Sequence, residues 1–299
     1  MIGENYKIGA FLNNLSKKTK NFVVLNSLLR KKLNFEDFIK VYEDRYFDFG
    51  NGVANMVSAG SGFLLRNRTP IAFAYTDLLI GHAYDNIRND FCLTNSNIKI
   101  VGFSSSFDNG LKGPAHQYFE EIGVLKNLPN LKIITPICLK NFYEYLEKSL
   151  FEFGPVFFCL NDSLLNEFEN IENNFLNEKT DNVVLSYGKI FEYAKEAVEL
   201  LKDDGFSIEI IPFEEVFPFN MTKFQHLLSV KNVVVLEDQN ENGLYLELLK
   251  NIDFNLFKGK LSFLGIQKFF IDSGKPEELY KKNSLDYLSL YRKVKEILL

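Results

Sequence analysis

The 299-residue sequence has no tryptophan, only three cysteines and three histidines, and no apolar run near the ~20 residues that a membrane-spanning helix requires. The cysteines Cys92, Cys138 and Cys159 lie far apart among apolar or strand-like residues. Their odd number and unpaired spacing predict reduced, buried thiols and not a disulfide framework or a zinc site. The histidines also lack the spacing of a metal site. We therefore expect no metal ligands and no membrane association.

A large excess of positive charge is absent as well. The formal net charge is −5, which argues against a general surface for nucleic acid or anionic lipid. The first residues, MIGENYKIGAFLNNLSKK, lack the basic-then-apolar order and the small-residue cleavage site of a signal peptide. The expected location is the cytoplasm.

Three common motifs of enzyme sites are also missing. There is no Walker phosphate loop, no glycine-rich dinucleotide loop directly after a strand, and no G-x-S-x-G nucleophile turn. Because a fold does not by itself define an activity, the function has to be sought in longer local patterns.

The chain does have a regular alternation of short β-rich runs and amphipathic segments. This alternation predicts the α/β class, with mostly parallel sheets covered by helices on both faces. Residues 162–181 are rich in Asn and Glu and show no periodicity, which indicates a linker between two three-layer α/β domains, 1–161 and 182–299. The expected strands are 21–25, 70–75, 98–103, 131–136 and 155–160 in the first domain and 182–188, 206–213, 232–238 and 261–266 in the second.

Five segments occur in the order found in the C-terminal half of transketolases. The most specific is GPAHQYFEEIGVLKNLPNLKIITP, in which a Gly-Pro-x-His-Gln loop precedes an acidic helix and then a strand. The other four are RYFDFGNGVANM, GHAYDNIRND, GPVFFCL and DSGKPEELYKKNSLD. The chain thus resembles the transketolase family over nearly its whole length, as the C-terminal subunit of a split, two-chain member.

This resemblance implies a transketolase-like pyrimidine-binding domain at 1–161 and the family's C-terminal domain at 182–299. It implies thiamine diphosphate as cofactor, with its diphosphate and a divalent metal held by a separate N-terminal subunit. A two-plus-two assembly is expected, with self-association through the pyrimidine-binding domain. Small residues along the helix expected there would allow close approach of a second helix, and these are Ala54, Ser58, Ala59, Gly60 and Gly62.

The resemblance also assigns residues to the cofactor, and one departs from the family. A glutamate that activates the aminopyrimidine ring is expected five residues after Asp48, where this chain has Val53, and the neighbouring Gln is Ala54. Valine can neither accept nor donate a hydrogen bond, so a group worth ~10²–10⁴-fold in rate is missing. Tyr75 is the residue expected to stack on the pyrimidine, and Leu78 replaces its aromatic companion.

On the substrate side, His116 of the Gly-Pro-x-His-Gln loop is the expected catalytic residue, because an imidazole gives and takes protons near neutral pH. Lys112 and His82 are the expected substrate-binding residues; His82 stands where relatives often carry arginine. Asp162 replaces an arginine that, in the family, holds the phosphate of a sugar phosphate. Because Asp162 would repel that phosphate, we expect a substrate outside the ordinary pentose phosphates.

Three functions remain open from the sequence. The leading one is transfer of a two-carbon ketol unit between sugar-type substrates by a two-chain, thiamine diphosphate-dependent enzyme. The second is a catalytically inactive or regulatory partner subunit, since Val53 removes the activating group. The third is a beta-type subunit of another thiamine-dependent enzyme, such as a 2-oxoacid dehydrogenase, although the GPAHQ segment resembles transketolase more closely.

Overall fold

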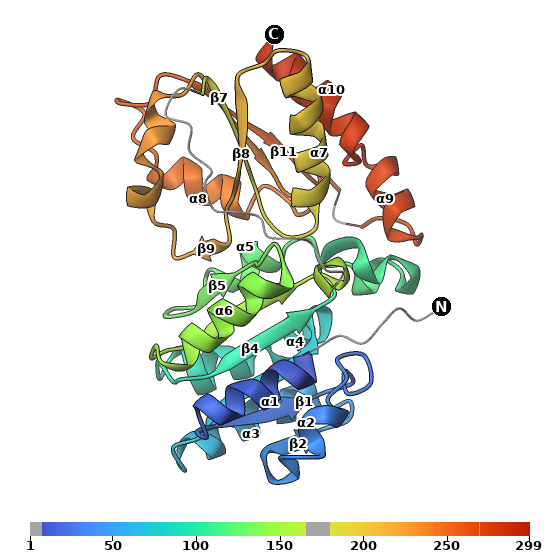
Figure 1. Cartoon of the computed structure of the whole chain (residues 1–299), viewed down its shortest axis with the longest axis vertical. Helices are drawn as coiled ribbons and strands as arrows, with labels where there is room; N and C mark the ends of the chain where they lie inside the picture. The colour runs from blue at the N-terminus through green and yellow to red at the C-terminus, as the bar shows by residue number, and fades with distance from the viewer. Residues whose placement is uncertain (1–7, 166–179, 269) are drawn as a thin grey trace.

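The structure is a computed structural model that describes residues 8–165, 180–268 and 270–299 (Figure 1). The proposed linker, 162–181, falls largely outside these ranges. Within them, every strand expected from the sequence is present with small shifts at its ends. The three cysteines are free and buried, as predicted.

The first sheet contains six parallel strands from the first half of the chain. Apart from the edge strand at residues 46–48, their apolar runs are buried along most of their length, as expected for a parallel sheet covered on both faces. In sheet order they are β2 (Tyr46–Asp48), β1 (Phe22–Asn26), β3 (Thr69–Tyr75), β4 (Lys99–Phe103), β6 (Val156–Leu160) and β5 (Lys132–Ile134).

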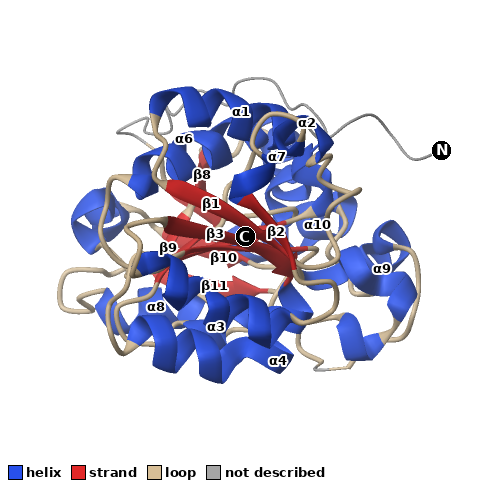
Figure 2. Ribbon diagram, turned by 90° about the horizontal axis from the view of Figure 1, so that it is seen from below, coloured by secondary structure: helices blue, strands red, loops and turns tan. Residues whose placement is uncertain are grey.

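Helices cover both faces of this sheet, which gives the three layers predicted from the sequence. Figure 2 shows α1 (Ile8–Lys18), α2 (Glu36–Ile39) and α6 (Leu139–Leu150) on one side of the strands, and α3 (Val53–Leu64) and α4 (Thr76–Asn86) on the other. Because side chains alternate along a strand, Phe73 packs into the cluster under α1 while Ala72 and Ala74 pack into the cluster under α3 and α4.

The second sheet is built entirely of parallel strands from the second half of the chain. Its order is β11 (Lys260–Leu264), β10 (Asn232–Leu236), β7 (Asn182–Ser186) and β8 (Ile208–Pro212). One face packs on α7 (Ile190–Asp203) and α10 (Tyr287–Leu298), and the other packs on α8 (Leu244–Asn251). The prediction of two α/β domains with mostly parallel sheets is confirmed.

A short strand from the second half of the chain completes the first sheet, which the sequence did not indicate. β9 (Glu215–Phe217) pairs antiparallel with β5 at the sheet edge. The carboxylate of Glu214, just before it, accepts a hydrogen bond from the Ile137 backbone nitrogen at 2.9 Å. The two halves of the chain are therefore joined by backbone pairing as well as by side chains.

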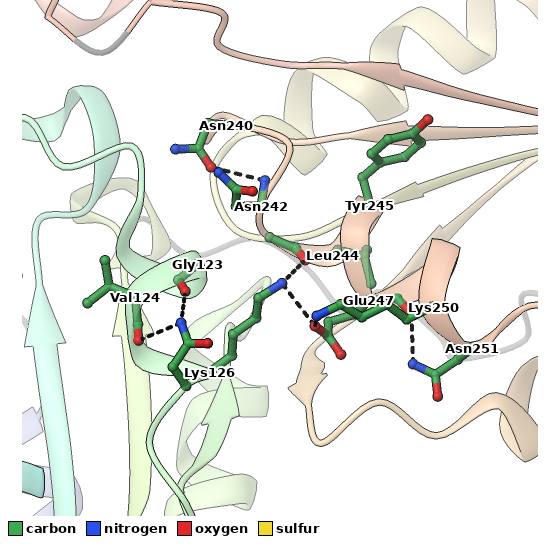
Figure 3. A network of polar contacts seen from close by, with 12 residues as sticks. Gly123, Val124, Lys126, Asn240, Asn242, Leu244, Tyr245, Glu247, Lys250 and Asn251 are labelled. Atoms are coloured by element: carbon green, nitrogen blue, oxygen red, sulfur yellow. Dashed lines mark hydrogen bonds and ion pairs between the residues drawn. The ribbon is translucent and has the colours of Figure 1, made fainter.

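A buried ion pair also joins the halves (Figure 3). Lys126, which follows α5 (Glu121–Leu125), places its Nζ 2.9 Å from Glu247 Oε1 on α8, and both side chains are less than a tenth exposed. Lys126 Nζ also lies 3.5 Å from the carbonyl oxygen of Gly243. This contact ties the end of α5, the helix that follows the loop with the expected catalytic residue, to the second domain.

Candidate functional site at the carboxyl end of the first sheet

The turn before α3 is held by side chains at the carboxyl ends of β1 and β2. Asp48 accepts hydrogen bonds from the Gly50 nitrogen at 2.9 Å and from Asn26 Nδ2 at 3.2 Å. Ser27 Oγ donates to the Gly50 carbonyl at 2.6 Å, and Gly50 adopts a φ of +55°, which favours glycine. This local geometry fixes the position at which α3 begins with Val53.

Val53 is buried, with 3% of its surface exposed, in the apolar cluster beneath α3 and α4. Leu78, in the first turn of α4, packs against the same cluster. Both side chains are apolar, and neither can donate or accept a hydrogen bond. They are compatible with only the apolar part of an aminopyrimidine, and Val53 provides no carboxylate that could activate such a ring.

His116 lies against a buried carboxylate. It ends a short 3-10 turn, η4 (Pro114–His116), and its Nδ1 is 2.5 Å from Asp77 Oδ2. The Asp77 side chain is 5% exposed, while that of His116 is 41% exposed. Because a carboxylate accepts, Nδ1 carries the hydrogen and donates it, which leaves Nε2 as an acceptor on the exposed ring.

Asp77 was not identified from the sequence. It lies in the first turn of α4, immediately beyond the carboxyl end of β3, where an open parallel sheet places its ligand-binding residues. An acidic residue at that place in the sequence is the signal that could have found it. Its second oxygen, Oδ1, is buried with no hydrogen-bond donor among the described residues.

Lys112 and Tyr75 lie together, and Lys112 covers the tyrosine ring. The Lys112 Nζ is 4.0 Å from the Tyr75 ring centroid, close enough for a cation–π interaction. Partial burial lowers the pKa of the Lys112 ammonium. Tyr75 packs on the α1 face of the sheet, opposite the cluster that holds Val53 and Leu78. Stacking of a pyrimidine on the ring face next to Lys112 would require that side chain to move.

A second lysine, also missed from the sequence, lies beside Tyr75. Lys32 Nζ is 5.3 Å from the Tyr75 centroid and 4.6 Å from that of Phe103. It contacts both oxygens of Asp162 at 2.8 and 2.7 Å and Ser104 Oγ at 2.9 Å. Lys32 therefore neutralises the negative charge of Asp162. This weakens the repulsion between Asp162 and a substrate phosphate that we inferred from the sequence. No sequence motif marks Lys32, because its loop approaches Asp162 only in the folded chain.

Behind this pair lies a partly buried carboxyl group. Asp108 Oδ2 accepts hydrogen bonds from the Asp162 nitrogen at 2.7 Å and from Asn161 Nδ2 at 3.3 Å. Burial, together with the neighbouring Asp162 carboxylate, raises the pKa of Asp108 well above its usual range. Asp108 thus acts as a fixed support for the segment that carries Asp162.

The remaining candidate, His82, is exposed on α4, and no described residue hydrogen-bonds its ring. The small residues of α3 divide between two faces. Gly60 is buried and a Cβ there would lie 3.0 Å from the Phe91 ring, whereas a Cβ at Gly62 would meet open space. Only the face with Gly62 is available to another molecule.

Across the described ranges, no three His, Cys, Asp or Glu side chains are grouped in a way that could hold a metal ion. Among the same residues, no helix combines the length and apolar character needed to cross a membrane.

The fold and these contacts define an α/β protein of two parallel-sheet domains, with polar side chains gathered at the carboxyl ends of the first sheet. Two family models match consecutive parts of it. The transketolase pyrimidine-binding domain matches residues 5–167, and the transketolase C-terminal domain matches residues 172–287. The chain belongs to the transketolase family.

Known relatives agree with this assignment. The chain is 28% identical over 298 residues to a Methanocaldococcus jannaschii protein named as a transketolase C-terminal section, covering 96% of this chain and 94% of that protein. It is 23% identical over 293 residues to 1-deoxy-D-xylulose-5-phosphate synthase of Clostridium kluyveri, covering 95% of this chain and 47% of the synthase. The chain thus spans about half the length of such synthases.

Solved structures show the same fold. A split gene transketolase, described as an inactive beta4 tetramer, superposes with a TM-score of 0.82 at 22% identity, covering 97% of this chain and 96% of that one. Transketolase from Campylobacter jejuni gives a TM-score of 0.78 at 19% identity, covering 96% of this chain and 45% of that one.

Proposed function

We propose that this chain is a cytoplasmic subunit of a two-chain, thiamine diphosphate-dependent transferase that moves a two-carbon ketol unit between sugar-type substrates. A separate N-terminal, transketolase-like chain would bind the diphosphate and its metal. Family membership supports the reaction class. Similarity to a named C-terminal section over 94% of that protein, and to about half of longer synthases, supports the need for a partner.

The observation that carries the catalytic part of this proposal is the contact between His116 and Asp77. The buried carboxylate of Asp77 lies 2.5 Å from His116 Nδ1. This contact favours one tautomer of the imidazole ring and fixes the direction in which Nε2 points. When bound, thiamine diphosphate would supply the nucleophilic carbon that attacks a carbonyl group. His116 would take or return a proton at a substrate hydroxyl, and Asp77 would stabilise the imidazolium formed.

Val53 and Leu78 would contact the pyrimidine through their apolar side chains. Tyr75 packs on the opposite face of the sheet, so its stacking on the same ring would require a rearrangement of Tyr75 as well as of Lys112. Val53 cannot hold a proton. The rate of cofactor activation is therefore expected to be low unless the partner chain supplies an acceptor, since such a group contributes ~10²–10⁴-fold.

Lys112 and His82 would contact the substrate. Both side chains are exposed; His82 lies on α4, and Lys112 lies over the Tyr75 ring. Neither has a carboxylate at ion-pair distance among the described residues. Lys112 adds a positive charge where relatives carry an acidic residue. This supports a substrate that differs from the ordinary pentose phosphates.

Self-association would use the outer face of α3, where Asn55, Ser61 and Gly62 are exposed. The small side chains there permit close helix packing. Sedimentation of the purified chain tests this: replacement of Gly62 by leucine should dissociate the assembly, and an unchanged mass would refute the proposed face.

The decisive experiment combines this chain with a chain carrying the diphosphate-binding half and the cofactor. Hydrogen–deuterium exchange at the thiazolium carbon should exceed that of the free cofactor, and ketol transfer should follow with suitable substrates. No acceleration would favour the inactive or regulatory subunit. Robust turnover of xylulose 5-phosphate with ribose 5-phosphate would refute the atypical substrate, while decarboxylation of a 2-oxo acid without ketol transfer would favour the third function.

A further inference from the structure

The two lysines beside Tyr75 differ in how fully their hydrogen-bonding capacity is used. An ammonium group has three donors. The three donors of the Lys32 ammonium have three acceptors within 2.9 Å, and these are the two carboxylate oxygens of Asp162 and Ser104 Oγ. Ser104 Oγ also donates to Asp162 at 2.6 Å, so the three groups form a closed set.

Lys112 has no such partners. Within the described part of the chain, its ammonium has no hydrogen bond or ion pair and lies over the Tyr75 ring, 4.0 Å from Nζ to the centroid. The carboxylates of Asp77 and Asp162 act on it electrostatically, and both are already engaged, Asp77 with His116 and Asp162 with Lys32. Lys112 therefore presents unused donors to whatever enters the site.

The balance of charge limits what these two lysines can bind. The cluster contains the positive charges of Lys32 and Lys112 against the carboxylates of Asp162 and Asp77. A ligand with one negative charge can pair with Lys112 alone. A dianion would also need Lys32, and it would have to displace Asp162 while lying close to that carboxylate.

We propose that Lys112 and Lys32 form an anion subsite beside Tyr75 in which Asp162 competes internally for Lys32, so that the site prefers a carboxylate on the substrate to a phosphate dianion. Lys112 is the binding residue, and the Lys32–Asp162 pair determines the preference. The subsite's part in catalysis rests on the proposed function, but its affinity for anions does not.

Binding can be measured on the full chain without any reaction. Nuclear magnetic resonance of chain labelled with ¹⁵N at lysine Nζ, titrated at pH 7.5 with acetate or inorganic phosphate, reports on Lys112. Acetate should shift the Lys112 signal at lower concentration than phosphate. Lys112→Gln should remove the responding signal without any other lysine signal responding in its place, whereas Lys258→Gln, which changes an exposed lysine of the second domain, should leave the response unaltered.

Variants of the internal pair test the origin of the preference. Asp162→Asn should strengthen phosphate binding by about three- to tenfold, because Lys32 loses its competing carboxylate. The double variant with Lys32→Met and Asp162→Asn removes both charges and should return phosphate affinity to within about twofold of the wild type. Circular dichroism confirms that each variant is folded.

Tighter binding of phosphate than acetate by the wild type, or no effect of Asp162→Asn, would overturn the proposal. Another lysine signal that still shifts with acetate at the same concentration in Lys112→Gln would also overturn it. If the two-chain assembly shows no ketol transfer while these titrations behave as expected, the proposed function fails and the anion subsite remains.

Discussion

At the scale of single residues, the candidate site depends on where carboxylates are present and where one is absent. Asp77 is buried against His116 and gives the imidazole a defined direction. Val53, at the position where the resemblance leads us to expect a glutamate, lies in an apolar cluster. Under the proposed function, His116 and Asp77 would handle a proton at the substrate, whereas Val53 could not handle one at the pyrimidine.

Replacement of Asp77 by asparagine is expected to lower kcat of the assembled enzyme by about 10²–10⁴-fold, with little change in KM. Asparagine preserves size but cannot stabilise an imidazolium, and it permits the wrong tautomer of His116. Steady-state kinetics over a range of pH measure the effect. Asp85→Asn makes the same change on the exposed side of α4 and should leave the rate unaltered; equal losses in the two variants would argue against a positioning role.

Replacement of Val53 by glutamate is expected to raise hydrogen–deuterium exchange at the cofactor by about 10²-fold or more in the two-chain assembly. The same change should lower the free energy of unfolding by roughly 1–3 kcal/mol, because a polar group enters an apolar cluster. Val53→Gln has a similar size but cannot carry the charge, so it should show the loss of stability alone. If glutamine accelerates exchange as much as glutamate, the missing carboxylate is not the cause of slow activation.

At the scale of secondary-structure elements, the site depends on segments that the second domain holds in place. The end of α5 is tied to the second domain by Lys126, whose ammonium pairs with Glu247 on α8 (Figure 3). β9 adds to the same junction by pairing with β5. Loss of either contact should alter the relative position of the domains before it unfolds them.

Replacement of Glu247 by glutamine should lower the free energy of unfolding by about 3–5 kcal/mol, because Lys126 is then left buried without its carboxylate. A double variant with Lys126→Met and Glu247→Leu should recover most of this loss. Urea denaturation followed by fluorescence and circular dichroism measures both. Lys231→Gln, which removes an exposed pair with Asp181, should cost no more than about 1 kcal/mol; a loss as large as that of Glu247→Gln would contradict this account.

At the scale of the whole molecule, acidic side chains are buried where the two domains meet. Burial raises the pKa of Glu121 to about 8, that of Glu237 to about 7 and that of Asp238 to about 6. Each has a hydrogen-bond partner: Gln239 donates to Glu121 at 2.6 Å, and the hydroxyls of Tyr187 and Tyr280 donate to Glu237 and Asp238 at 2.5 Å.

These shifts predict that stability falls as the pH rises. In the folded chain the three acids keep their protons to higher pH than in the unfolded chain, whose acids ionise near pH 4. The unfolded state therefore binds fewer protons between about pH 4 and pH 8, and the free energy of unfolding decreases through that window. Urea midpoints at pH 5.5, 7.0 and 8.5 should decline in that order.

Glu121→Gln, which stays neutral at every pH, should flatten this decline and raise stability at pH 8.5. Glu144→Gln, on the exposed face of α6, provides the matched control and should retain the wild-type slope. A midpoint that rises with pH in the wild type would exclude buried acids as the dominant titrating groups.

The sequence by itself determined the fold class, because short apolar runs alternating with amphipathic segments allow little other than parallel strands between covering helices. It also determined the family, since GPAHQ and the segments around it are specific in order and spacing. The three-residue strand β9 was missed because so short a run carries no periodicity.

Only the tertiary structure decided which charges meet. Asp77 and His116 are separated by 39 positions, and Lys32 and Asp162 by 130, so no local pattern could pair them. From the sequence Asp162 was a lone negative charge, and in the folded chain it is the partner of a lysine. The physical reason is that hydrophobic periodicity is a local property of the chain, whereas electrostatic pairing depends on which strand ends the sheet brings side by side.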